Sequence, residues 1–151
     1  TKKLEKYKKK YLNKVSEYLK NYENFNKGKI GVIHGDPVLS NIIKKNNNDL
    51  IFIDPRGSLG KNFTIFGDIN YDFAKIYQSL TGYENIILEM KIDQNYLNDL
   101  KSHFENLIIN KNQIDNVETL RYLTSSLYFT LINFHNKKYT SKFLDIACDL
   151  I

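Results

Sequence analysis

A short polar segment in the first third of the chain carries side chains that could perform chemistry together. It reads His34-Gly35-Asp36-Pro37-Val38-Leu39-Ser40-Asn41, and a later apolar run ends in Asp54. A loop carboxylate such as Asp36 can accept or orient the proton of an attacking hydroxyl. The amide oxygen of Asn41 and the carboxylate of Asp54 are hard ligands suited to Mg²⁺. Phosphoryl transfer from ATP needs an aligned hydroxyl, a neutralised triphosphate and little water, and this set could supply the first two.

A β-hairpin would bring these side chains together. Residues 41–45 and 50–54 are rich in apolar residues, and the polar segment 46–49 joins them. That pattern predicts two strands with a polar turn. Asn41 would then open one strand and Asp54 would close the other, so that the two side chains could sit side by side. Residues 30–33 predict a further short strand leading into the loop.

The remaining segments predict helices. Residues 2–24 carry an apolar stripe at helical spacing. A helix is expected from Asp68, as its N-cap, to Gly82, and others near 93–109, 115–135 and 140–151. The expected fold class is α+β and mainly helical, with one small hairpin carrying the metal site. The chain divides into an N-terminal helix (1–26), a catalytic loop with a metal-binding hairpin (30–56) and a helical subdomain (68–151).

Composition is that of one ordinary globular domain of 151 residues, with 42% hydrophobic and 26% charged residues. The single cysteine, Cys148, precludes an internal disulfide, which fits a reducing compartment and a cytoplasmic location. No apolar run approaches the roughly 18 residues that span a bilayer, so no membrane association is expected.

The net charge of +5 raises the alternative of nucleic-acid binding through the Lys-rich start of the first helix. Arg56 and Arg121 are the only arginines in the sequence. Base readout and bidentate phosphate binding favour arginine over lysine. We therefore expect the lysines to form a solvated helix face, without a nucleic-acid partner.

The motifs in order resemble those of the aminoglycoside phosphotransferase and choline kinase-like family, which has a protein kinase-like fold. The resemblance is carried by H-G-D-x-x-x-x-N, by the apolar strand ending in Asp54, and by Gly67-Asp68-Ile69-Asn70-Tyr71-Asp72-Phe73-Ala74-Lys75. It implies that Asp36 is the catalytic residue and that Asn41 and Asp54 bind Mg²⁺. It also implies that His34 braces the loop and that Asp72 accepts hydrogen bonds from the loop backbone.

The same resemblance implies ATP (or GTP) as phosphoryl donor and a small-molecule hydroxyl as acceptor, in a sugar, an amino alcohol or an aminoglycoside. No Gly-rich strand-turn-strand precedes residue 30, so the chain resembles the C-terminal lobe alone, and a nucleotide-covering N-terminal lobe is expected upstream. Arg56 departs from the family pattern after the metal-binding Asp. We hypothesise that it reaches a phosphate or an anionic group of the substrate.

Three alternatives stay open at this point. Asp36 and Asn41 are residue types that favour turns and could be ordinary turn residues. The chain could be a non-catalytic kinase-like module that binds a partner. It could also be a metal-dependent hydrolase with His34, Asp36, Asp54 and Asp68 as ligands. If the acceptor is cationic, helical residues on the substrate side are candidates for its recognition: Asp99, Glu105, Asp115, Glu118, Tyr122 and Tyr128.

Overall fold

The structure is a computed structural model that describes residues 2–91, 93–111 and 113–151, with side chains from residue 8 onward. It is α+β and 58% helical with small antiparallel sheets, which confirms the expected fold class at this level. The helices are α1 (Lys2–Asn24), α2 (Ile69–Leu80), α3 (Tyr83–Ile87), α4 (Gln94–Asn110), α5 (Val117–Leu131) and α6 (Thr140–Asp149), with 3-10 turns η1 (Leu39–Asn41) and η2 (Lys137–Tyr139). In the described ranges, no helix combines the length and apolar character needed to cross a bilayer.

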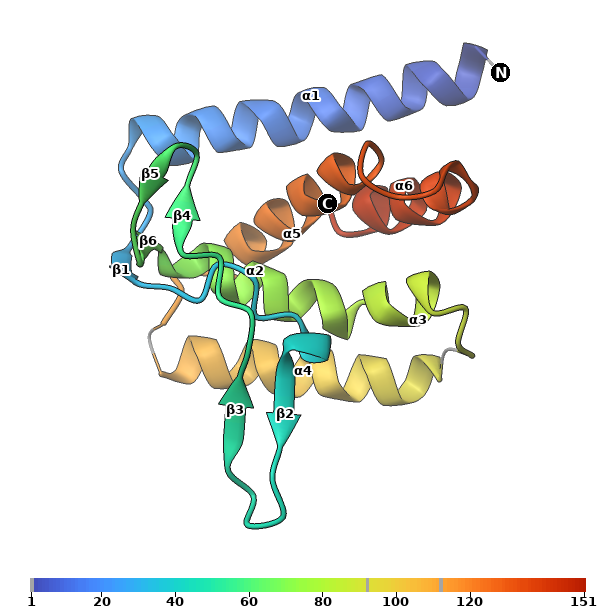
Figure 1. The fold of residues 1–151 in the computed structure, drawn as a ribbon. Helices are drawn as coiled ribbons and strands as arrows, with labels where there is room; N and C mark the ends of the chain where they lie inside the picture. Colours follow the sequence, from blue (N-terminus) through green and yellow to red (C-terminus); the bar gives the residue numbers. More distant parts are fainter. Residues whose placement is uncertain (1, 92, 112) are drawn as a thin grey trace.

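Helix α2 lies at the centre of the helical body (Figure 1). It packs against α5 and α4, and α1 and α6 pack on α5 in turn. The main core joins α1, α2, α4 and α5 through buried apolar residues: Tyr22, Ala74, Tyr77, Ile108, Ile114, Leu120, Leu123 and Leu127. On α1, the ring of Tyr18 stacks on Tyr122 with centroids 4.0 Å apart. The predicted stripe on α1 therefore faces the core from residue 15 onward, whereas Leu4 and Tyr7 lie outside the described side chains.

Side-chain caps decide where the helices begin. Asp68 accepts from the Asn70 backbone N–H at 3.0 Å, which confirms it as the N-cap of α2. Asn116 caps α5 in the same way through the Thr119 N–H at 2.8 Å, so that helix begins at Val117 and not at residue 115 as predicted. It also ends earlier than predicted, at Leu131. Such polar caps satisfy backbone donors that the first helical turn leaves without partners.

The strands form three two-stranded antiparallel sheets. The predicted hairpin is present as β2 (Ile42–Lys44) and β3 (Leu50–Phe52), with Ile43 opposite Ile51, and it projects from the helical body (Figure 1). The prediction that Asn41 and Asp54 belong to these strands is wrong. Asn41 ends the turn η1, and Asp54 lies two residues beyond β3 in a left-handed conformation.

Two other pairings were not predicted from the sequence. The expected strand near residues 30–33 is β1 (Ile30–Val32), and its partner is β6 (Phe66–Asp68), directly before α2. In addition, β4 (Ser58–Leu59) pairs with β5 (Asn62–Phe63), although one Pro and two Gly in residues 55–61 predict a loop where β4 lies. The β1–β6 pair matters for the site because it sets the start of the loop beside the start of α2.

Candidate functional site

The first turn of α2 holds the start of the polar loop through Asp72. Its carboxylate accepts two backbone hydrogen bonds, from the His34 N–H at 2.7 Å and from the Gly35 N–H at 2.9 Å. Hydrogen bonds to an ionised carboxylate are the stronger kind. The contact is the one that a loop-bracing Asp72 requires, and it fixes the backbone immediately before Asp36.

The end of the loop is closed by Asn41 and anchored to the C-terminal end of α2. The Asn41 Nδ2 donates to the backbone oxygen of Asp36 at 2.9 Å. The Leu39 N–H donates to Ser79 Oγ at 3.0 Å, and that hydroxyl donates to Glu84 at 2.7 Å. Pro37 and Val38 are buried between these anchors. The loop is thus held at both ends by one helix, while Asp36 lies between the two fixed points.

Position 35 requires glycine for two reasons, its backbone conformation and the close approach of Arg56. Its φ is +82°, a region that costs an L side chain about 1–2 kcal/mol. A Cβ there would meet the Cβ of Arg56 at 2.6 Å, because the Arg56 N–H donates to the His34 oxygen and draws the two segments together. This explains why the loop carries Gly at position 35.

Gly35→Ala should therefore lower the free energy of unfolding by more than the strain alone. Gly57→Ala is the matched control, because Gly57 also has positive φ (+65°) but nothing lies within 4 Å of its added Cβ. We expect about 1–2 kcal/mol for the control and about 1–3 kcal/mol more for Gly35→Ala from overpacking, measured by urea unfolding. Combining Gly35→Ala with Arg56→Gly should recover the excess in a double-mutant cycle. Equal losses in the two single variants would contradict the proposed clash.

Asp36 forms an ion pair with Lys75, a residue to which the sequence motifs assign no role. The Lys75 Nζ lies 2.8 Å from Oδ1 of Asp36. That oxygen is shielded from solvent and makes no aligned hydrogen bond, so the contact is an ion pair rather than a directed bond. The Asp36 charge also reaches α3: burial, and then the charges of Asp36 and Glu84, raise the pKa of Tyr83.

The His34 ring contacts both the backbone of the loop and the hairpin. Its Nδ1 accepts the Asp36 backbone N–H at 3.3 Å, and its ring packs against Phe52 with centroids 5.8 Å apart. Because Nδ1 accepts, the neutral ring carries its proton on Nε2, which is buried without a hydrogen-bond partner among the described residues. The ring thus links the loop to the hairpin, as the bracing role requires.

Asn41 and Asp54 flank the two strands of the hairpin, although neither belongs to a strand. The Ile53 N–H donates to the backbone oxygen of Asn41 at 3.0 Å, so the residue directly before Asp54 pairs with Asn41. Asn41 uses its amide nitrogen to close the loop, which leaves its side-chain oxygen as a potential ligand. Asp54 is exposed and holds φ at +59°, a strained conformation of the kind that clusters at functional sites.

Arg56 is also exposed, but its guanidinium is already engaged. It lies 4.9 Å from the centroid of the Tyr71 ring, and its Nη2 donates to the Tyr71 hydroxyl at 2.5 Å. Cation–π contact and the hydrogen bond together hold the side chain over the first turn of α2. A role in phosphate binding would use Arg56 in this preset position beside the loop.

Asp68 stands apart from the other acids of the predicted hydrolase set. Its carboxylate accepts from the Lys29 and Asn70 N–H groups, both at 3.0 Å, and from the Tyr22 hydroxyl at 2.7 Å. These bonds give Asp68 a structural role at the junction of β6 and α2. Among the described residues, no group of three or more His, Cys, Asp or Glu side chains is arranged to hold a metal. That statement does not cover Asn41 and Asp54, which are only two side chains, one of them an asparagine.

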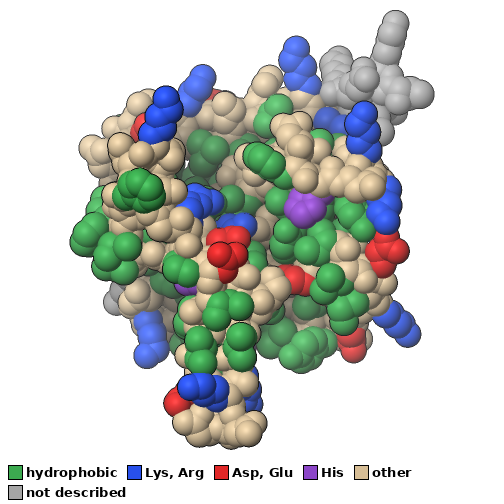
Figure 2. Space-filling view, in the orientation of Figure 1, with side chains coloured by type: hydrophobic (Ala, Val, Ile, Leu, Met, Phe, Trp, Pro, Cys, Tyr) green, Lys and Arg blue, Asp and Glu red, His purple; other side chains and the backbone are tan. Residues whose placement is uncertain are grey.

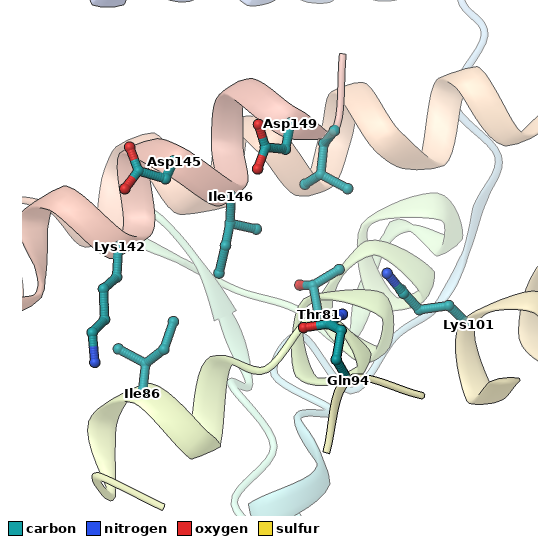
Figure 3. Close-up of a pocket in the computed structure, with 9 residues that line it drawn as sticks. Thr81, Ile86, Gln94, Lys101, Lys142, Asp145, Ile146 and Asp149 are labelled. Atoms are coloured by element: carbon teal, nitrogen blue, oxygen red, sulfur yellow. The ribbon is translucent and has the colours of Figure 1, made fainter. Parts of the chain in front are cut away.

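A cavity of about 380 Å³ opens among the later helices, in the region where an acceptor site was expected (Figure 3). Ile86 from α3 and Ile146 from α6 point toward one another across it, and Lys101 comes from α4. The residues proposed for a cationic acceptor are mostly engaged elsewhere. Glu105 pairs with Arg121 and Asp115 with Lys29, while Tyr128 is fully buried.

Comparison with known proteins finds no match: neither a protein family, nor a curated protein, nor a solved structure matches this chain.

The sequence did not predict several side chains that contact the loop. Lys75, Ser79 and Glu84 all contact it from α2 and α3. Lys75 follows Asp72 by three residues, so helical spacing alone could have placed both on one face. Ser79 and Glu84 carry no comparable signal.

Proposed function

We propose that this chain carries the catalytic and metal-binding half of an ATP-dependent phosphotransferase that acts on a hydroxyl of a small molecule. The observation that best supports it is the pair of hydrogen bonds that the Asp72 carboxylate accepts from the loop backbone. A turn that serves only to reverse the chain needs no such clamp. Here the clamp fixes a carboxylate that remains 41% exposed, between two anchors.

In this proposal Asp36 accepts the proton of the acceptor hydroxyl, while Asn41 and Asp54 hold Mg²⁺. The donor set fits the ion, since an amide oxygen and a carboxylate are hard ligands and Mg²⁺ keeps several waters and phosphate oxygens of its own. When bound, the metal would neutralise charge on the triphosphate. Arg56, held over Tyr71, would meet a phosphate or an anionic group of the substrate.

The nucleotide would need cover from a second lobe, as in the aminoglycoside phosphotransferase and choline kinase-like family. The strands around the loop are unusually apolar on the outside, and Figure 2 shows hydrophobic side chains over the projecting hairpin. The exposed large apolar residues of the strands and of the segments beside them, here called the strand face, are Ile30, Val32, Ile43, Leu50, Phe52, Ile53, Leu59, Phe63, Ile65 and Phe66. Exposed apolar side chains in such number near the loop support a nucleotide-covering partner lobe here.

The same strand face favours one alternative, a kinase-like module that binds a partner without catalysis. Both functions would use the apolar strands, but only the phosphotransferase needs Asn41 and Asp54 to bind a metal-nucleotide. The hydrolase has less support, since Asp68 is committed to three structural hydrogen bonds.

Calorimetric titration of the full-length gene product with Mg-ATP tests the proposal. Asn41→Ala and Asp54→Asn should each weaken binding by about 10-fold or more, at least the range seen when metal sites lose a supporting residue. Asn is chosen at position 54 because it tolerates the left-handed backbone that Asp54 adopts. Glu17→Gln, which changes an exposed acid on α1, serves as control. Absence of binding by the wild type would leave the non-catalytic module as the better account.

A further inference from the structure

Lys75 is placed for a role that the motifs of the sequence do not assign. It projects from α2 one turn after Asp72, so that one helix face holds both the loop backbone and the loop carboxylate. Its side chain is only 12% exposed, whereas that of Asp36 is 41% exposed. A lysine has thus been drawn out of water to meet the shielded Oδ1 of Asp36, while the rest of that side chain stays partly exposed.

Stability is a poor explanation for this arrangement. The Lys75 ammonium and the Asp36 Oδ1 are both shielded from water, and the cost of removing charges from water offsets much of their attraction. The loop already has its anchors in Asp72, Asn41 and Ser79. The ammonium also has three donors, and its contact with Asp36 is to a single oxygen, at 2.8 Å. Donors therefore remain for an anion that arrives beside Asp36.

We propose that Lys75 is a second catalytic residue, whose ammonium orients Asp36 in the resting protein and binds the terminal phosphoryl group of a nucleoside triphosphate during transfer. This inference rests on the proposed function. The motif loop itself, Pro37-Val38-Leu39-Ser40, holds no cation after Asp36. Lys75 supplies one from the neighbouring helix, at the place where negative charge would gather.

The chemical step balances without further reactants. The acceptor oxygen forms a bond to the γ-phosphorus, the bond from that phosphorus to the β,γ-bridging oxygen breaks, and the nucleoside diphosphate leaves with the electron pair. The hydroxyl proton passes to the Asp36 carboxylate. Lys75 keeps its proton throughout and donates hydrogen bonds to the equatorial phosphoryl oxygens, whose charge is spread in the transition state. Fixed donors of this kind act without reorganisation at the moment of reaction.

Lys75→Met tests the inference in the full-length gene product, with Lys75→Arg as the conservative variant and Lys44→Met, on the hairpin, as control. Two quantities are measured: kcat and KM for Mg-ATP turnover, and the Kd of Mg-ADP with and without aluminium fluoride, which mimics the phosphoryl group in transfer. Lys75→Met should lower kcat by about 10²–10³-fold, the usual loss when one preorganised donor is removed. It should weaken Mg-ADP–aluminium fluoride binding to a similar degree. Mg-ADP alone should bind within about threefold of wild type, and Lys75→Arg should restore most of the loss.

The outcomes separate the two proposals. A Lys75→Met protein that melts earlier but keeps its kcat and its aluminium fluoride complex would overturn the catalytic role of Lys75 alone. A Lys75→Met protein in which only the KM for Mg-ATP rises would also overturn that role alone. A wild type that binds no nucleotide would overturn this inference and the proposed function together. A wild type that binds but shows no turnover is decided by the aluminium fluoride complex, which must depend on Lys75.

Discussion

Replacing Asp36 with Asn should lower kcat for Mg-ATP-dependent phosphotransfer by about 10²–10⁴-fold, the contribution typical of a positioned general base. The amide is nearly isosteric with the carboxylate but cannot take the hydroxyl proton. The backbone contacts of residue 36, with Asn41 and with the His34 ring, do not involve its side chain and should persist. KM for Mg-ATP should therefore change little, and the defect should appear in kcat.

The control for Asp36→Asn must remove a carboxylate without touching the loop. Glu17→Gln does so on the exposed side of α1. Circular dichroism of both variants should show a cooperative melt, because the amide that replaces the Asp36 carboxylate keeps an oxygen that can accept from the Lys75 ammonium, which lies 2.8 Å from Oδ1 in the wild type. A kcat for Asp36→Asn equal to that of the control would remove the catalytic role of Asp36. A joint loss of kcat and melting temperature would point instead to collapse of the loop.

The helices could be predicted because their signals are local. Asp68 and Gly82 mark the two ends of the segment around α2, and the apolar stripe on α4 is plain in the sequence. The hairpin β2–β3 was equally accessible, since its polar turn follows directly from residues 46–49. The ends of α5 were harder to predict from the sequence. Residue 115 fits a helical pattern, but the Asn116 side chain takes the Thr119 N–H and starts the helix later.

What could not be predicted depends on contacts between distant segments. The pairing of β1 with β6 joins residues on either side of the whole hairpin, and strands of three residues carry no readable alternation. The Asp36–Lys75 ion pair has the same origin, since it needs both the loop and α2 in place. The clash that fixes Gly35 arises because Arg56 returns to the loop after the hairpin. Sequence motifs indicated the chemistry of the loop, whereas its neighbours required the fold.

Asp72→Ala should have the largest effect on the loop as a structure. The substitution removes the acceptor of two charge-assisted bonds, from His34 and Gly35, and leaves both N–H groups without it. Each hydrogen bond to a charged group contributes about 1.5–3 kcal/mol, so the free energy of unfolding should fall by about 3 kcal/mol or more. Since Asp36 follows Gly35 directly, kcat should fall as well. Asp72→Asn, which keeps one acceptor oxygen, should lie between wild type and Asp72→Ala.

Asp72 also stabilises α2 through the helix dipole. This contribution to the free energy of unfolding must be separated from the loss of the two hydrogen bonds. Glu118 occupies the first turn of α5 and is exposed, so Glu118→Ala removes a contribution of that kind alone, worth about 0.3–1 kcal/mol. Hydrogen exchange then locates the difference. Asp72→Ala should strip protection from the His34 and Gly35 amides, whereas Glu118→Ala should leave both protected. If the two variants lose equal stability and the Gly35 amide stays protected, Asp72 acts on its own helix and the loop is held by its other anchors, Asn41 and Ser79.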